Sequence, residues 1–148
     1  MTNKIVACPS CDVRNRVPGA ASGVPRCASC HSPLPWLVEA TDSDFDAASH
    51  APVPVLVDLW APWCGPCHMV SPAVERAALE LAGQLKVVKV DVDRAPGIST
   101  RLGVQGIPTL LVLEGGEEVA RQVGAVPENH LLAWIRSFTA APASKVGS

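Results

Sequence analysis

Three Cys-x-x-Cys pairs constrain this chain more than any other feature, because one spacing occurs in two different sequence settings. The pairs are Cys8 and Cys11, Cys27 and Cys30, and Cys64 and Cys67. The first two pairs flank turn-forming residues and are separated by 15 residues, whereas the third follows an apolar run and precedes a helical pattern. The sequence therefore predicts two chemistries, metal binding by the first four cysteines and disulfide exchange by the last two.

The first four cysteines have the spacing expected of a four-thiolate zinc site. Residues 1–35 are too poor in apolar side chains to bury a core, so a bound metal ion would supply the missing stability. His31 is expected to be a solvated loop residue rather than a ligand, and two reducible cysteine pairs are the alternative to a metal site. We expect one structural zinc ion, with no position left open for water or substrate, on Cys8, Cys11, Cys27 and Cys30.

Composition excludes several classes of partner. The chain has 148 residues and a net charge of −2, so neither nucleic acid nor an anionic membrane surface is indicated. No aromatic residue precedes Trp36, and no apolar run is long enough to span a bilayer. Since the N-terminus also lacks the apolar core of a signal peptide, we expect a cytoplasmic protein rather than a secreted one with three structural disulfides.

From Trp36 onward, strand and helix patterns alternate. Residues 35–40 are predicted to form a strand, followed by a short helix capped by Thr41 or Ser43. The almost wholly apolar run 53–60 is typical of a central strand that is buried on both faces. It leads directly into the third cysteine pair, and the helix that follows is predicted to kink at Pro72 and to end near Gly83.

The second half of this region continues the alternation. Residues 85–91 are predicted to form a second central strand, a short helix near 98–102 follows, and 109–113 and 117–123 form a hairpin. A last amphipathic helix starts near Pro127 and presents Leu131, Ile135 and Phe138 on one face. This order predicts an α/β protein with a mixed central sheet and helices on both faces. The expected organisation is a zinc-binding segment at 1–35, a domain at 36–139 and a loose tail at 140–148.

The third cysteine pair stands where a strand ends and a helix begins. Unsatisfied N–H groups and the positive dipole end of that helix favour a thiolate, so Cys64 is predicted to be the more acidic and more exposed thiol. Cys64 would then attack a substrate disulfide. Cys67, one turn further along and more buried, is predicted to resolve the mixed disulfide and release the reduced substrate.

Asp58 is a carboxylate within the apolar run 53–60. Burial there would raise its pKa towards the range useful for proton transfer, which makes Asp58 the candidate base for Cys67. A solvent-facing carboxylate at a strand end is the alternative. Lys89 could tune Asp58 electrostatically, although a lone lysine in a strand more often reaches solvent.

From Trp36 to Phe138 the chain resembles the thioredoxin family. Residues 60–67, Trp-Ala-Pro-Trp-Cys-Gly-Pro-Cys, are similar to the active-site signature, and residues 106–109, Gly-Ile-Pro-Thr, resemble the cis-proline loop of that family. Further matching positions are Asp58, Pro72, Lys89 and Gly124. The cysteine-rich segment at 1–35 resembles the zinc-binding bacterial branch known as thioredoxin 2.

The resemblance implies a thioredoxin fold and a protein-disulfide reductase. It implies that Pro108 is cis and that substrate contacts come from Trp63, Ile107, Pro108 and Gly124. His68 departs from the family pattern, since many thioredoxins have lysine there, and it makes the local charge sensitive to pH near neutrality.

The expected partners are disulfide-containing proteins and an NADPH-dependent thioredoxin reductase, and the chain is expected to be a monomer. NADPH itself is not expected to bind, because no glycine-rich dinucleotide fingerprint follows a strand. Two alternatives stay open. One is a disulfide isomerase or oxidase, against which the Gly-Pro dipeptide between Cys64 and Cys67 argues within the family. The other is a redox-sensing or protein-docking role for the zinc-binding segment.

Overall fold

The computed structural model describes residues 4–139, and the predicted tail at 140–148 lies outside them. Eleven elements are formed within this range: β1 (Lys4–Ala7), β2 (Arg14–Val17), β3 (Leu37–Glu39), α1 (Phe45–Ser49), β4 (Val55–Trp60), α2 (Gly65–Glu80), β5 (Lys86–Asp91), α3 (Pro96–Arg101), β6 (Thr109–Glu114), β7 (Glu117–Val123) and α4 (Glu128–Arg136). The predicted alternation of strands and helices after residue 36 is confirmed.

The central sheet has five strands in the order β3-β5-β4-β6-β7. β5 pairs in parallel with β3 and β4, whereas β6 pairs antiparallel with β4 and β7, so the sheet is mixed as predicted. The first five residues of β4 are all buried, which explains the nearly continuous apolar run there.

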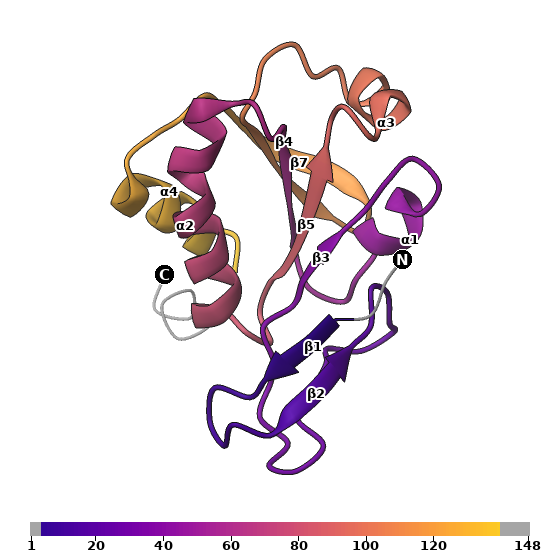
Figure 1. Cartoon of the computed structure of the whole chain (residues 1–148), viewed down its shortest axis with the longest axis vertical. Coiled ribbons are helices and arrows are strands. Elements are labelled where there is room, and N and C mark those ends of the chain that lie inside the picture. Colours follow the sequence, from indigo (N-terminus) through magenta and orange to yellow (C-terminus); the bar gives the residue numbers. More distant parts are fainter. Residues whose placement is uncertain (1–3, 140–148) are drawn as a thin grey trace.

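Alternate residues of the central strands pack on opposite faces of the sheet. Leu56 and Val87 belong to a core cluster with buried residues of α2 and α4. Val57 and Val88 belong to a second cluster with buried residues of α1 and α3. The sheet is therefore covered by helices on both faces, as the sequence predicts (Figure 1).

The predicted cap of the first helix is wrong. Neither Thr41 nor Ser43 is the N-cap residue of α1; this position is held by Asp44, which makes no side-chain cap hydrogen bond. Instead, the backbone N–H of Thr41 donates to Asp44 Oδ1 at 2.7 Å, and the Thr41 carbonyl accepts from the N–H of Phe45 at 3.0 Å. In this turn the side chain of Asp44 accepts a hydrogen bond from the backbone N–H of Thr41, whereas the sequence predicts that the side chain of Thr41 or Ser43 caps the helix.

The other helices follow the sequence pattern with small shifts. α2 contains Pro72 and is followed by Gly83 at φ +86°, in the left-handed region that favours glycine. The kink at Pro72 stays a prediction. α4 ends at Arg136, so Phe138 lies beyond the helix, although it still packs on the same cluster with its ring edge-on to Trp134.

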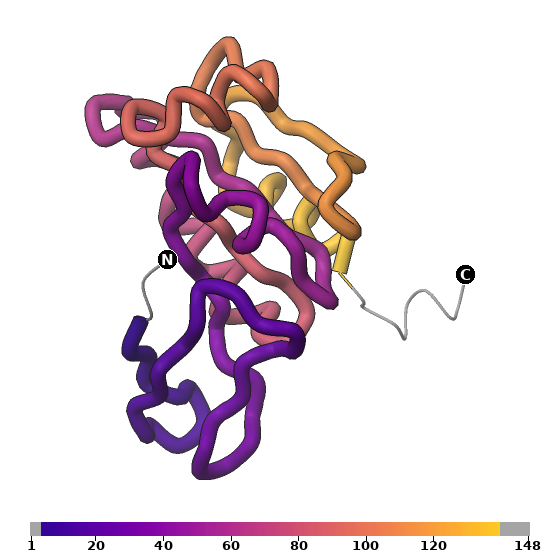
Figure 2. Tube along the Cα trace, turned by 90° about the vertical axis from the view of Figure 1, so that its right-hand side faces the viewer, coloured from indigo at the N-terminus to yellow at the C-terminus, as the bar shows by residue number. Residues whose placement is uncertain are grey.

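The N-terminal segment (the described residues 4–35) forms a two-stranded antiparallel sheet of β1 and β2, followed by turns. Four of its buried residues share one cluster with Trp36 and Phe45 of the following region; they are Cys8, Val17, Cys27 and Leu34. Both views place this segment against one end of the five-stranded sheet, opposite the end where β4 leads into α2 (Figures 1 and 2). The predicted domain boundary at residue 35 stays a prediction.

Within residues 4–139, no helix combines the length and the apolar composition required to cross a bilayer.

Candidate redox site and candidate metal centre

The third cysteine pair lies at the junction of β4 and α2, as the sequence predicts. Cys64 is the N-cap residue of α2, and Cys67 lies in its first turn. The two residues form a disulfide, with their Cα atoms 5.3 Å apart. The backbone N–H of Cys67 donates to Cys64 Sγ at 3.1 Å. An N–H of the helix terminus that has no partner within the helix therefore points directly at the sulfur that is predicted to become the thiolate.

The charge around the start of α2 also favours a thiolate on Cys64. The first turn of the helix contains no acidic side chain, so the positive end of the helix dipole is not neutralised by a nearby carboxylate within the helix. Pro66 occupies this turn, where its missing N–H costs no helical hydrogen bond. The local sequence thus starts the helix immediately after the nucleophile.

Both cysteines are nearly covered in the disulfide form. Cys64 is 4% exposed and Cys67 is 2% exposed, so the predicted contrast in exposure is small in this state. Half-buried side chains of Trp60, Val92 and Ile107 pack around the pair. Cys64 Sγ lies 3.9 Å from the carbonyl oxygen of Ile107. A substrate can therefore contact only the small part of Cys64 that stays exposed.

The Ile107–Pro108 peptide bond is cis, which confirms the expectation drawn from the family resemblance. Pro108 O accepts the backbone N–H of Gly124 at 2.8 Å, and Gly124 has φ +91°. Among the described residues, no backbone–backbone hydrogen bond uses the N–H or carbonyl of Ile107. These groups remain able to pair with an extended peptide beside the disulfide.

Trp63 is 70% exposed, whereas Trp60 is half-buried. The Trp63 indole N–H donates to Asp93 Oδ2 at 2.7 Å. Asp93 was missed at the sequence level because it lies 30 residues away in an irregular loop, with no pattern that signals the contact. The hydrogen bond holds a large apolar surface in one orientation next to Cys64.

His68 also has a definite place. Its Nε2 donates to the carbonyl of Pro62 at 2.7 Å, and its ring lies edge-on to Trp60 with 6.2 Å between centroids. The side chain therefore ties the first turn of α2 to the loop before Cys64. The sequence identified His68 only as a departure from the family pattern.

Asp58 is buried in β4 at 1% exposure, so the solvent-facing alternative is wrong. Its Oδ2 lies 4.0 Å from Lys89 Nζ, which also donates to Ser71 Oγ at 3.1 Å. Asp58 Oδ1 has no hydrogen-bond partner among the described residues. Burial raises the pKa of Asp58 to about 6 against the opposing effect of Lys89, and Glu75 raises the pKa further. Its role as base for Cys67 stays a prediction.

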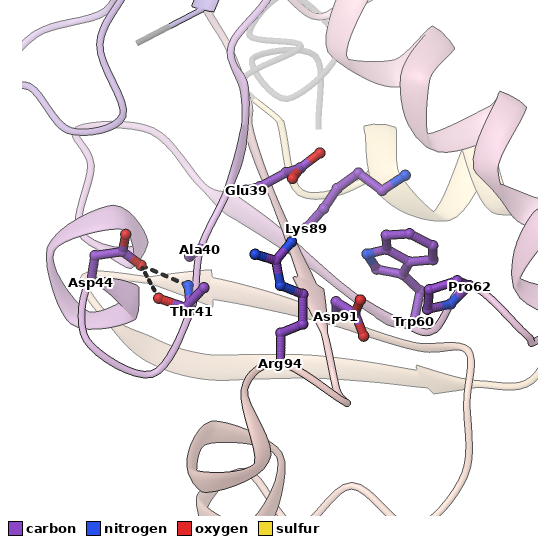
Figure 3. A pocket seen from close by; sticks show the side chains of 9 residues that line it. All are labelled: Glu39, Ala40, Thr41, Asp44, Trp60, Pro62, Lys89, Asp91 and Arg94. Atoms are coloured by element: carbon purple, nitrogen blue, oxygen red, sulfur yellow. Dashed lines mark hydrogen bonds between the residues drawn. The ribbon is translucent and has the colours of Figure 1, made fainter. Parts of the chain in front are cut away.

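A polar cavity of about 510 Å³ opens beside Lys89 and Trp60 (Figure 3). Neither Cys64 nor Cys67 lines it. The residues that line it are Glu39, Ala40, Thr41, Asp44, Trp60, Pro62, Lys89, Asp91 and Arg94. The cavity is thus lined by Lys89, the ion-pair partner of Asp58, and not by the reacting sulfurs.

The four cysteines of the N-terminal segment form a second site, and their Sγ atoms all lie within 4.8 Å of one another. The Cys8–Cys30 and Cys11–Cys27 sulfurs are 3.6 and 3.5 Å apart. A tetrahedral zinc ion with Zn–S bonds of about 2.3 Å requires sulfurs separated by about 3.8 Å. The arrangement therefore fits one tetrahedral metal ion. The structure brings together the four cysteines that the sequence predicts as ligands.

Two matching turns hold these sulfurs. In the first, the Cys8 carbonyl accepts the N–H of Asp12 at 2.8 Å; in the second, the Cys27 carbonyl accepts the N–H of His31 at 2.9 Å. Asp12 and His31 both have positive φ, at 66° and 67°. His31 is exposed and does not belong to the cysteine cluster, as expected. The two Cys-x-x-Cys pairs of the N-terminal segment are thus closed by the same local backbone geometry.

Backbone and side-chain amides point at the sulfur of Cys27. The N–H groups of Ser29 and Cys30 donate to it at 3.4 and 3.5 Å, and Asn15 Nδ2 donates at 3.5 Å. The Cys30 N–H and, with it, the Asn15 amide lower the pKa of Cys27 to about 6. These donors favour the thiolate, which is the form that binds metal.

Comparison with known proteins gives a consistent result. The sequence model of the Thioredoxin family matches residues 36–137. Thioredoxin 1 of Nostoc sp. is 48% identical over 94 residues, which are 63% of this chain and 88% of that protein. Thioredoxin of Haemophilus influenzae is 42% identical over 100 residues, 67% of this chain and 94% of that protein. The family match thus includes the disulfide at α2 and leaves out the four-cysteine cluster.

The buried carboxylate predicts a pH-dependent loss of stability that Asp58→Asn should remove. The folded protein keeps the Asp58 proton up to about pH 6, whereas the ordinary pKa is 3.8. The unfolded chain therefore releases this proton first, and Asp58 by itself lowers the free energy of unfolding by on the order of 3 kcal/mol as pH rises through that window. Urea unfolding of the oxidised protein between pH 3.5 and 7.5 measures this effect. The exposed carboxylate variant Glu114→Gln should keep the fall, and an equal fall in Asp58→Asn would contradict the assignment.

Proposed function

Because the chain belongs to the thioredoxin family and is a thiol–disulfide oxidoreductase, we propose that it reduces protein disulfides with Cys64 as nucleophile and Cys67 as resolving thiol. The observation that carries this proposal is the Cys64–Cys67 disulfide at the N-terminus of α2, where Cys64 Sγ accepts the Cys67 N–H. A thiolate formed on Cys64 would receive the same hydrogen bond together with the helix dipole.

The reaction begins from the reduced dithiol. The Cys64 thiolate attacks one sulfur of the substrate disulfide, and the other substrate sulfur leaves as a thiolate that takes up a proton. Cys67 then loses its proton and attacks Cys64 Sγ, which releases the second substrate thiolate. Two electrons pass to the substrate, and Cys64 and Cys67 end as the disulfide found in the structure.

Asp58 is proposed to take the proton of Cys67. Its support is physical: a carboxylate at 1% exposure, with one oxygen lacking a partner among residues 4–139 and a pKa of about 6, can accept a proton near neutral pH. Lys89, 4.0 Å from the other oxygen, would stabilise the ionised form.

Substrate binding is proposed to involve Trp63, Ile107, Pro108 and Gly124. The exposed Trp63 indole offers apolar contact area, and Asp93 fixes its orientation. The free backbone groups of Ile107 can bind an extended segment of substrate. A Cβ placed on Gly124 would meet no other atom within 4 Å, so the space beside its backbone is open to a substrate chain.

The electrons are proposed to come from an NADPH-dependent thioredoxin reductase, since the family implies disulfide substrates and such reductases as partners in general. We propose a monomer that works in the cytoplasm. A reducing compartment favours a dithiol enzyme over a stable disulfide.

The N-terminal segment is proposed to bind one structural zinc ion through Cys8, Cys11, Cys27 and Cys30, as in the thioredoxin 2 branch. The support is the four-sulfur cluster with separations near those of a zinc tetrahedron. Four protein ligands complete the coordination, so the metal would stabilise the fold rather than react. The N-terminal segment and the junction of β4 with α2 lie at opposite ends of the sheet, which would separate metal binding from disulfide exchange (Figure 1).

The reductase assignment is tested with insulin as the disulfide substrate, thioredoxin reductase and NADPH, following NADPH oxidation. The full chain should turn over, and both Cys64→Ser and Cys67→Ser should lose at least about a thousandfold because each removes one half of the dithiol. Only Cys67→Ser should accumulate a mixed disulfide with insulin. Turnover that survives Cys64→Ser would contradict the role of Cys64 as nucleophile, whereas a Cys64–Cys67 disulfide that the reductase cannot reduce would favour the oxidase or isomerase alternative.

The zinc assignment is tested by loading the full chain with Zn²⁺ and measuring bound metal by atomic spectroscopy. One equivalent per chain is expected, and Cys27→Ser should lose most of it by removing one of the four thiolates. Cys67→Ser is the matched control and should keep its zinc. If both serine variants lost zinc equally, or if the wild type bound none, the proposed site would be wrong.

A further inference from the structure

Lys86, the first residue of β5, is completely buried, with 0% of the residue exposed. Its Nζ donates to the carbonyl of Gly19 at 2.7 Å and lies 4.4 Å from the ring centroid of Trp36. Among the described residues, no carboxylate lies within ion-pair distance of this ammonium group, and burial lowers the pKa of Lys86 to about 8. The catalytic mechanism makes no use of this lysine.

A buried ammonium group without a carboxylate is costly unless other groups replace its hydration. Here the replacement comes from one backbone carbonyl of the N-terminal segment and one indole face. If the turn at Gly19 moved away, Lys86 would lose its hydrogen-bond acceptor. The position of that turn is therefore tied to the buried end of β5.

Trp36 holds the same turn through a second hydrogen bond. Its indole N–H donates to the carbonyl of Pro18 at 2.9 Å, and Trp36 is itself completely buried. Two donors from outside the N-terminal segment therefore bind two consecutive carbonyls, those of Pro18 and Gly19. These residues begin the connection from β2 to the second cysteine pair.

A third contact comes from the turn between α2 and β5. A Cβ placed on Gly83 would lie 2.9 Å from Pro33 Cβ, so the absence of a side chain permits the close approach of the two residues. Pro33 follows the second cysteine pair and bridges to Arg26, just before Cys27. Pro33 thus links the two ends of the second cysteine turn to the turn that precedes β5.

We propose that Lys86 is a positioning residue for the four-cysteine site: its ammonium group fixes the Pro18–Gly19 turn against the start of β5, and metal retention depends on that docking. This inference rests on the proposed metal binding. It adds a link that the cysteine pattern does not contain, because the residue that organises the site lies 56 positions after the last cysteine ligand. By reciprocity, a bound metal also stabilises the docked arrangement.

The experiment compares the full chain with Lys86→Met and Trp36→Phe, which each remove one donor to the turn while keeping most of the apolar side chain. After loading with Zn²⁺, transfer of the metal to a chromogenic chelator should be about tenfold faster in each variant, a change at the lower end of the affinity losses that follow removal of groups that orient metal ligands. In the double variant, zinc release should be accelerated by less than the product of the two single accelerations, since both donors act on one turn. Arg76→Met, which removes an exposed basic side chain, is the matched control and should release zinc at the wild-type rate.

A second readout requires no metal. Amide hydrogen exchange at pH 7 should speed up in β1 and β2 of Lys86→Met and Trp36→Phe, but not in β4 or β6, and insulin reduction should stay at the wild-type rate. Unchanged exchange in β1 and β2 would overturn the inference, as would acceleration spread equally over all strands. If the wild type binds no Zn²⁺, the proposed metal site fails, and the exchange pattern alone then decides the docking role of Lys86.

Discussion

The pairing of β4 with β5 on one side and β6 on the other is the constraint on which the rest of this structure depends. It makes β4 a central strand, whose two faces are then buried by the core clusters on either side of the sheet. The strand leads directly to Cys64 at the N-terminus of α2, next to the N–H groups of that helix. The same pairing places Asp58 in the interior beside Lys89, its register partner on β5. The nucleophile and the buried carboxylate are therefore positioned by one strand.

One spacing gives two different sites because the backbone around it differs. At Cys64 the chain passes from a buried strand into a helix of 16 residues, and the helix N-terminus acts on a single sulfur. At Cys8 and Cys27 the chain makes tight turns closed by residues of positive φ, which bring four sulfurs together. The first arrangement favours a reactive thiolate that exchanges disulfides, whereas the second shares four thiolates around one position.

The features that sequence reasoning predicted well depend on local pattern: the buried run of β4, the hairpin of β6 and β7, and both classes of cysteine pair. The misses depend on contacts between distant residues. Asp93 binds Trp63 across 30 positions, and Lys86 binds Gly19 across 67 positions, with no periodicity to signal either contact. The cap of α1 failed for another reason, because Thr41, Ser43 and Asp44 are all good capping residues, and only the backbone geometry selects among them.

The most direct test of this account measures the thiolate of Cys64 in the reduced full chain. Alkylation with iodoacetamide between pH 5 and 10, resolved for each cysteine by peptide mass mapping, gives a rate profile for Cys64 and for Cys67. The account predicts that Cys64 reacts first and that its midpoint lies clearly below the ordinary thiol value of about 8.5, because the α2 terminus stabilises its thiolate. A midpoint at or above that value, or faster alkylation of Cys67, would contradict the claim that the helix N-terminus activates Cys64.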